Sequence, residues 1–351
     1  MCSSKLVILP VAAVSTLSVV LFGSACTPTP MGPPLGSGGS TTTNQSSEPS
    51  GNGGTGGVVG PSVTVTLPDL PPPSDNGGTG GTTTPATWPP EGFVVKEASY
   101  GAYALGPLVS SLPDATDGQL GSEGGPGRCS GLFGVLRDFK MGTVEGGHPD
   151  FEKPPMVRDE GLVTDMLGDD KKPVYAHGDE TTRTTSGQAN FDQWYRDVPD
   201  VNTAYVIGFQ FVPNGDVFTF AASLGNTDAD VEDTSYYPLD DQGFGNEGKR
   251  HNYHFTTEIH TSFTYNGGEI FTFQGDDDVF VYINNHRVID LGGIHEQLTQ
   301  TVDLDAQAEA LEITTGNIYE LAVFNAERHT TQSNFRIDTT MVFEDCGQII
   351  K

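Results

Sequence analysis

Three consecutive carboxylates, Asp276, Asp277 and Asp278, lie between two strongly apolar segments of the chain. Like charges this close repel one another and raise one another's pKa unless a cation or hydrogen-bond donors compensate them. Carboxylate oxygens grouped in this way suit a hard cation such as Ca²⁺. The sequence therefore predicts a Ca²⁺ site at this turn. The alternative is that the carboxylates cap the turn and are satisfied by Arg328 or by backbone N–H groups.

Histidine and arginine side chains are the next candidates for a site. His295 follows a pair of glycines, and Arg328 and His329 lie together in a polar loop further along the chain. We expect His295, Arg328 and His329 to line a polar pocket beside the carboxylates, and His295 and Arg328 to contact a ligand there. No His-Glu-x-x-His or comparable spacing is present, so hydrogen bonding is favoured over zinc binding for these side chains.

No catalytic signature accompanies these residues. The sequence contains no Gly-x-Ser-x-Gly turn, no phosphate-cradling loop and no catalytic set of cysteine and histidine. Carboxylates are so numerous that pairs resembling a glycosidase dyad are expected by chance. Trp194 and Tyr195 are expected to pack in a core, with a sugar-stacking platform as the alternative. A binding protein is therefore favoured over an enzyme, and a glycan-cleaving enzyme is the weaker alternative.

The charge of the chain excludes two classes of partner. The 351 residues carry a formal net charge of −29. This argues against nucleic acid, because binding to phosphates depends on Lys and Arg. It also opposes docking on an anionic membrane surface, which needs basic clusters. Charge of this sign suits a secreted, soluble surface or sites that collect cations.

The N-terminal residues have the features of an export signal followed by a linker. Lys5 precedes a mostly apolar run over residues 6–22, and three small residues come directly before Cys26. This predicts a signal peptide over residues 1–25, with Cys26 as the lipidated first residue of a lipoprotein or, alternatively, ordinary signal cleavage. Residues 26–90 are rich in Gly, Ser, Thr and Pro and are expected to form a disordered linker. The expected location is the outer membrane or cell surface through the lipid anchor, or free secretion.

Alternation of apolar and polar residues with a period of two is the main structural signal in the rest of the chain. It predicts strands at residues 132–139, 217–220, 255–263, 270–273, 279–283, 287–291, 319–323 and 335–343. The Asn-Gly-Gly run at residues 266–268 predicts a hairpin turn, and helical turns are expected only at residues 190–196 and 305–311. We expect one all-β domain over residues 129–346, an antiparallel β-sandwich or barrel, after a lead-in segment at 91–128.

Two cysteines, Cys129 and Cys346, lie at the ends of this domain. An exported domain matures in an oxidising compartment, where a remaining pair of thiols favours one disulfide. The bridge would constrain the unfolded chain by about 4–5 kcal/mol and would place the two ends of the domain side by side. Free or metal-bound thiols are the alternatives.

The segment over residues 243–343 carries a recognisable pattern. It includes the runs GFGNEGKRHNYHFTTEIHTSF and GDDDVFVYINNHRVIDLGGIH, with VLRDFK, KPVY and FDQWYRDVPDVN upstream. Over residues 129–346 the chain resembles the fibro-slime domain family of bacterial surface proteins and slime-mould secreted factors. That family is related to the protective-antigen-type β-sandwich of toxins, glycosidases and yeast flocculins. The resemblance implies a jelly-roll-like fold and, because many copies of this sandwich bind carbohydrate, a sugar-binding function.

The resemblance also implies a set of metal ligands. In the flocculin-type relatives, two consecutive Asp residues joined by a cis peptide hold Ca²⁺, and the ion binds sugar hydroxyls. By this resemblance the pair is Asp276 and Asp277, with Asn334 or Asn325 as a further ligand from a second loop. Asp278 departs from the wider family, which often has Gly there. We expect a surface module that binds a polysaccharide or other glycan in adhesion or extracellular matrix; the alternative is a structural surface or fibre component without a sugar site.

Overall fold

The computed structural model describes residues 89, 92–108, 131–223 and 235–350. The chain divides into two units, Met1–Val63 and Thr64–Lys351, and all the described residues belong to the second. The predicted signal peptide, most of the predicted linker, Cys26 and Cys129 lie outside the described residues. Among the described residues, no helix is both long enough and apolar enough to cross a membrane.

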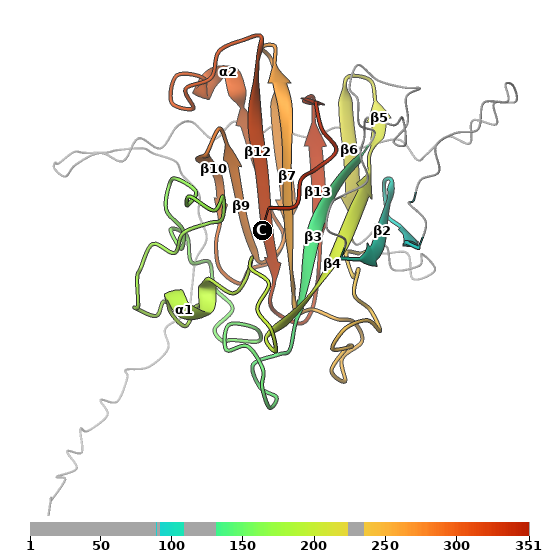
Figure 1. Ribbon diagram of the computed structural model, residues 1–351, viewed down its shortest axis with the longest axis vertical. Helices are drawn as coiled ribbons and strands as arrows, with labels where there is room; N and C mark the ends of the chain where they lie inside the picture. The colour runs from blue at the N-terminus through green and yellow to red at the C-terminus, as the bar shows by residue number, and fades with distance from the viewer. Residues whose placement is uncertain (1–88, 90–91, 109–130, 224–234, 351) are drawn as a thin grey trace, which may run out of the picture. The chain divides into compact units, whose positions relative to one another are not determined.

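Two antiparallel sheets form the described part of the protein (Figure 1). The larger has nine strands in the order β1-β2-β4-β3-β7-β12-β9-β10, with β14 paired to β7. The smaller has five strands in the order β11-β8-β13-β6-β5. Every pairing between these strands is antiparallel, which confirms the expected all-β sandwich.

The strands and helices have the following bounds. The larger sheet contains β1 (Val94–Glu97), β2 (Ala102–Pro107), β3 (Gly131–Phe139), β4 (Asn202–Gln210), β7 (Phe255–Tyr265), β9 (Asp278–Ile283), β10 (His286–Leu291), β12 (Asn317–Glu327) and β14 (Val342–Phe343). The smaller sheet contains β5 (Val212–Asn214), β6 (Val217–Ala222), β8 (Ile270–Gly275), β11 (Leu298–Asp303) and β13 (Phe335–Thr339). The short helices α1 (Gln188–Phe191) and α2 (Leu304–Gln307) overlap the two predicted helical segments.

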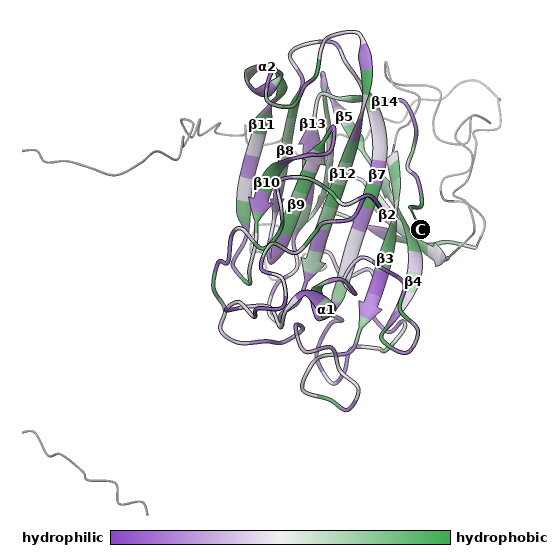
Figure 2. Ribbon diagram, turned by 60° about the vertical axis from the view of Figure 1, so that its left-hand side comes forward, coloured by the Kyte–Doolittle hydropathy of each residue, from purple (hydrophilic) through white to green (hydrophobic). Residues whose placement is uncertain are grey.

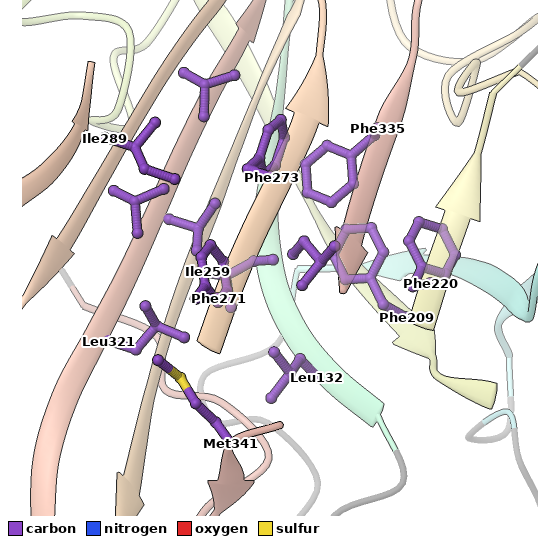
Figure 3. Packing of buried hydrophobic residues seen from close by; sticks show 14 of the residues in the cluster. Leu132, Phe209, Phe220, Ile259, Phe271, Phe273, Ile289, Leu321, Phe335 and Met341 are labelled. Carbon is purple, nitrogen blue, oxygen red and sulfur yellow. The ribbon is translucent and has the colours of Figure 1, made fainter. Parts of the chain in front are cut away.

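The main core lies between the two sheets (Figure 3). Hydrophobic segments run along the strands of both sheets (Figure 2). Phe209 of the larger sheet stacks on Phe335 of the smaller one, with ring centroids 5.2 Å apart. Burying a side chain of this size contributes about 1.5–3 kcal/mol, so such pairs hold the sheets together. The residues labelled in Figure 3 are Leu132, Phe209, Phe220, Ile259, Phe271, Phe273, Ile289, Leu321, Phe335 and Met341.

A second core covers the other face of the larger sheet. Phe280 and Tyr282 of β9 pack there with Phe191, Trp194 and Tyr195 from the segment that precedes β4. The intervening valine and isoleucine side chains of β9 belong to the main core. Strand β9 is therefore buried on both faces, which is why its sequence is an uninterrupted apolar run. Trp194 has no exposed surface, so its predicted place in a core is confirmed.

The predicted hairpin at residues 266–268 is wrong. Strand β7 lies in the larger sheet and β8 in the smaller one, so the chain changes sheets at this turn. Gly267 and Gly268 adopt φ values of 96° and 89°, and the Glu269 carboxylate accepts the backbone N–H groups of Asn266 at 2.7 Å and Gly267 at 2.8 Å. The turn residues thus reverse the chain direction without pairing the strands on either side.

Two further boundaries differ from the predictions. The strand predicted over residues 335–343 ends at Thr339, and the chain then crosses to the larger sheet, where β14 pairs with β7. The lead-in segment contributes β1 and β2, and β2 pairs with β4. The larger sheet therefore begins ahead of the predicted domain boundary at residue 129.

The C-terminal residues lie alongside β3. The Phe133 N–H donates to the Cys346 carbonyl at 2.6 Å, and Cys346 is buried. The last residues of the domain therefore run beside its first long strand. The disulfide between Cys129 and Cys346 stays a prediction, because Cys129 lies outside the described residues.

Candidate cation site at the β8–β9 turn

The three carboxylates lie where the chain passes from the smaller sheet to the larger one. Strand β8 ends at Gly275 and β9 begins at Asp278. In the larger sheet, Ala326 of β12 lies opposite Asp278, so the residues that follow β12 reach the carboxylates. In the smaller sheet, Phe335 of β13 lies opposite Gly275, which brings the preceding residue, Asn334, to the same turn. The aspartate turn and the predicted second loop, which holds Arg328 and Asn334, therefore meet at this point.

Asp276 is held by Asn334. Its two carboxylate oxygens accept the backbone N–H of Asn334 at 2.5 Å and the side-chain amide N–H at 2.7 Å. Burial nevertheless raises the pKa of Asp276 to about 6. Gly275 makes this approach possible, because a Cβ there would lie 2.7 Å from the Asn334 carbonyl oxygen.

Asp277 joins the turn to two other segments. Its backbone has a φ of 52°, in the left-handed region. One carboxylate oxygen accepts the backbone N–H of His295 at 3.3 Å, and the other accepts that of Arg328 at 2.8 Å. Burial raises the pKa of Asp277 to about 8; the Arg328 charge opposes this rise, and the charges of Asp276 and Asp278 add to it. The raised pKa means that the charges and hydrogen bonds around Asp277 do not fully stabilise its ionised form.

Asp278 is compensated by Arg328. The Arg328 Nε lies 2.6 Å from the Asp278 carboxylate, and neither side chain has exposed surface. The Arg328 Nη1 donates to the Asp150 carbonyl at 3.0 Å and the Thr184 carbonyl at 2.8 Å, and the guanidinium carbon lies 4.6 Å from the centre of the Trp194 ring. For Asp278 this is the turn-capping arrangement proposed as the alternative. Arg328 would therefore act on a ligand through the carboxylates rather than by contact.

Glu327 is a residue of this site that the sequence analysis missed. Its side chain is 1% exposed, and its Oε1 has no hydrogen-bond partner among the described residues. Burial raises its pKa well above the usual range, and the charges of Asp277 and Asp276 raise it further. A signal was present in the sequence. Asn325 and Glu327 continue the period-two alternation of the strand predicted at residues 319–323. An acid at such a position implies a polar environment in the fold.

Four of the predicted residues line a small pocket of about 80 Å³, whereas Arg328 and Asn334 do not line it. Asp276, Asp277, His295 and His329 all line it. The ring nitrogens of His295 lie 2.9 Å and 3.1 Å from the carbonyl oxygens of Glu296 and Leu291, which fixes the ring at the pocket wall. A space of this size accepts a single ion or a few water molecules, not a whole sugar.

Two details differ from what the resemblance implies. The peptide between Asp276 and Asp277 is not cis; among the described residues the cis bond is Pro154–Pro155. Asn325 is turned toward the backbone, with its side-chain amide 3.3 Å from the carbonyl oxygen of Asp278. Among the described residues, no three carboxylate, histidine or cysteine side chains are grouped so that they could hold a metal ion by themselves.

Comparisons with known proteins find similarity over the region that contains the site. The model of the PA14 domain matches residues 219–350, which include the whole β8–β9 turn and the loop after β12. Protein psiR of Dictyostelium discoideum is 35% identical over 235 residues, covering 61% of this chain and 22% of psiR. Protein psiD of the same organism is 38% identical over 223 residues, covering 60% of this chain and 39% of psiD. The matched region thus spans about a fifth to two-fifths of the length of these curated relatives.

Similarity to solved structures is slight. A beta-glucosidase from Kluyveromyces marxianus, solved in complex with glucose, is 14% identical with a TM-score of 0.18, covering 24% of this chain and 11% of that one. A likeness at that level carries no argument about fold or activity. By sequence, residues 219–350 of this chain are similar to the PA14 domain.

Proposed function

We propose that this chain is an exported surface module of the fibro-slime type that binds a glycan through a Ca²⁺ ion at Asp276 and Asp277. The observation that carries this proposal is a charge imbalance. The carboxyl groups of residues 276–278 and Glu327 are all buried, and the charges of Asp277 and Asp276 raise the pKa of Glu327. Of these four carboxyl groups, Asp278 is the one that forms an ion pair with Arg328. A cation in the adjoining pocket would supply the missing positive charge.

The pocket geometry suits a hard ion whose shell is only partly made of protein groups. Ca²⁺ takes six to eight oxygen ligands at about 2.3–2.6 Å, and these include backbone carbonyls and water. Asp276 and Asp277 would provide the carboxylate oxygens, while sugar hydroxyls would replace water on the open side. In the present arrangement Asn334 donates to Asp276, so it supports that carboxylate; its predicted role as a ligand remains a prediction.

The location of the module is part of the proposal. The PA14 similarity of residues 219–350 supports an extracellular setting. The apolar N-terminal run before Cys26 supports export, with a lipid on Cys26 as the membrane attachment. Residues 26–90 would then serve as a stalk that holds the module away from the membrane.

A glycan array tests the proposal directly. The protein is applied with millimolar Ca²⁺ and again with EDTA, alongside Asp277→Asn and the control Asp216→Asn, which alters an exposed carboxylate far along the chain from the turn. We expect binding with Ca²⁺ that is lost with EDTA and in Asp277→Asn but kept in Asp216→Asn. Binding that persists in EDTA contradicts the mechanism. No binding under either condition would favour the structural component instead.

A further inference from the structure

A second and larger pocket lies away from the carboxylate turn. It has a volume of about 350 Å³. It is lined by side chains of β3, by residues of the segment between β3 and β4, and by the C-terminal residues Ile349 and Ile350. Leu108 and Val135 form part of an apolar wall. The polar lining groups are Arg137, Asp170, Lys172, Tyr195, Arg196 and Asp197, and Arg196 pairs with Asp170 at 2.7 Å. A hollow of this size that combines an apolar wall with convergent polar groups is typical of a small-molecule site.

The buried charges of this pocket do not balance. Arg137 and Lys172 both pair with one carboxylate, that of Glu258, and all three side chains are at most 3% exposed. Arg137 has a second partner in Asp197, at 2.9 Å, but the Asp197 side chain is 52% exposed. The His260 ring nitrogen, 2.8 Å from Glu258, gives that carboxylate a further donor. Lys172 also donates to the Ile350 carbonyl at 2.9 Å. Two buried cations therefore share one buried anion, while the other two carboxylates of the pocket, Asp197 and Asp170, are 52% and 43% exposed, and Asp170 pairs with Arg196.

A hydrogen-bond donor of the described pocket also lacks an acceptor. The Tyr195 hydroxyl is buried and has no partner among the described residues, and burial raises its pKa well above the usual range, so it stays protonated. Arg137 donates through Nε to Asp197 and through Nη1 to Glu258. A buried donor without a partner, here the Tyr195 hydroxyl, calls for a ligand with an acceptor atom.

We propose that this pocket binds a compact organic carboxylate, about the size of one hexuronic acid, with its carboxylate facing Arg137 and Lys172. The Tyr195 hydroxyl donates to the same carboxylate, and the body of the ligand packs on Val135, Ile349 and Ile350. This pocket shares no lining residue with the pocket at the carboxylate turn. A carboxylate on a sugar and one on another small ring share this chemistry, and the probes below separate them.

Binding is measured by calorimetry on the full chain in EDTA, so that no Ca²⁺-dependent site contributes. The probes are glucuronate, glucose as the same ring without a carboxylate, and cyclohexanecarboxylate as a carboxylate without hydroxyls. We expect glucuronate to bind and glucose not to bind. Binding of cyclohexanecarboxylate as well shows that the carboxylate alone is recognised, whereas its failure identifies the uronic sugar. Equal binding of glucose and glucuronate, or no binding of either carboxylate, overturns the proposal.

Two variants shift the affinity in opposite directions. Tyr195→Phe removes a hydroxyl without a partner, so the fold persists and glucuronate binding weakens about ten-fold. Asp197→Asn removes the rim carboxylate that competes for Arg137, so binding tightens several-fold. Asp216→Asn, at an exposed turn, is the matched control and leaves the affinity unchanged. Unaltered affinity in both Tyr195→Phe and Asp197→Asn contradicts the assignment.

Discussion

Arg328 and Asp278 form an ion pair that is closed to solvent, with 2.6 Å between Arg328 Nε and the Asp278 carboxylate. The pair ties the residue after β12 to the first residue of β9. The backbone N–H of the same arginine donates to Asp277 at 2.8 Å. One residue therefore neutralises the carboxylate that faces inward and positions the neighbouring carboxylate that lines the pocket.

Removing this arginine is expected to destabilise the domain strongly. Arg328→Met leaves the Asp278 carboxylate buried without a cation, and breaking a buried pair in this way costs about 3–5 kcal/mol. Arg158→Met is the control, because its pair with Glu160 is half exposed and worth about 1 kcal/mol or less. Urea unfolding measures both variants. Equal losses in the two variants would show that the buried pair has no special weight.

Acid should weaken the fold through Glu258. Burial alone would raise the pKa of Glu258, but the hydrogen bond from His260 and the charges of Arg137 and Lys172 outweigh it and lower the pKa from 4.5 to about 2. A lowered pKa means that the unfolded chain binds the proton more tightly. The ionised Glu258 carboxylate therefore adds about 3 kcal/mol to the free energy of unfolding. This contribution is complete above about pH 4.5 and is lost as the pH falls toward 2.

Glu258→Gln isolates this contribution from those of other carboxyl groups. The difference in unfolding free energy between the natural protein and Glu258→Gln should be constant from pH 5 to 7 and should shrink steadily below pH 4.5. Guanidinium unfolding at a series of pH values measures it. A difference that does not depend on pH would contradict the assignment of a low pKa to Glu258.

Gly275 should be intolerant of any side chain. In Gly275→Ala the new Cβ would lie 2.7 Å from the Asn334 carbonyl oxygen and 2.7 Å from the Phe273 ring. The loop holding Asn334 must then move away from Asp276, at a cost of about 1–3 kcal/mol. Thermal unfolding measures the loss, and Ca²⁺ binding should weaken with it. Natural stability and natural Ca²⁺ affinity in this variant would show that the close approach is not needed.

The cysteine prediction can be checked chemically. The hydrogen bond between Phe133 and the Cys346 carbonyl places the C-terminal segment beside β3, as a bridge to Cys129 requires. Non-reducing peptide mapping should recover Cys129 and Cys346 in one cross-linked peptide, and reduction should lower stability by up to about 4–5 kcal/mol. Two alkylatable thiols in the untreated protein would contradict the bridge.

Sequence patterns located the strands well where the burial of alternate or successive side chains alone set the pattern. The alternation over residues 255–263 matches β7, and the apolar run at 279–283 matches β9, because side-chain burial follows the pleat. The sheet to which each strand belongs was not predictable in this way. The turn at residues 266–268 reverses the chain equally well within one sheet or between two, and only the packing of distant strands decides which occurs.

The candidate site was predictable in part for a similar reason. The run of three aspartates marks itself in the sequence, but their separate roles do not. Asp278 differs from its neighbours because the pairing of β9 with β12 brings Arg328 to it from fifty residues away. Glu327 acquires its importance from the same pairing. Such contacts depend on strand register, which no local pattern specifies.

Ca²⁺ titration by calorimetry on the full chain tests the central claim most directly. We expect one ion to bind the natural protein and the control Asp216→Asn, and Asp277→Asn to remain folded without binding it. At a hundred times the dissociation constant, Ca²⁺ should stabilise the natural protein by about 2.7 kcal/mol, which thermal unfolding detects. No heat and no stabilisation at millimolar Ca²⁺, or equal binding by Asp277→Asn, would contradict the cation site.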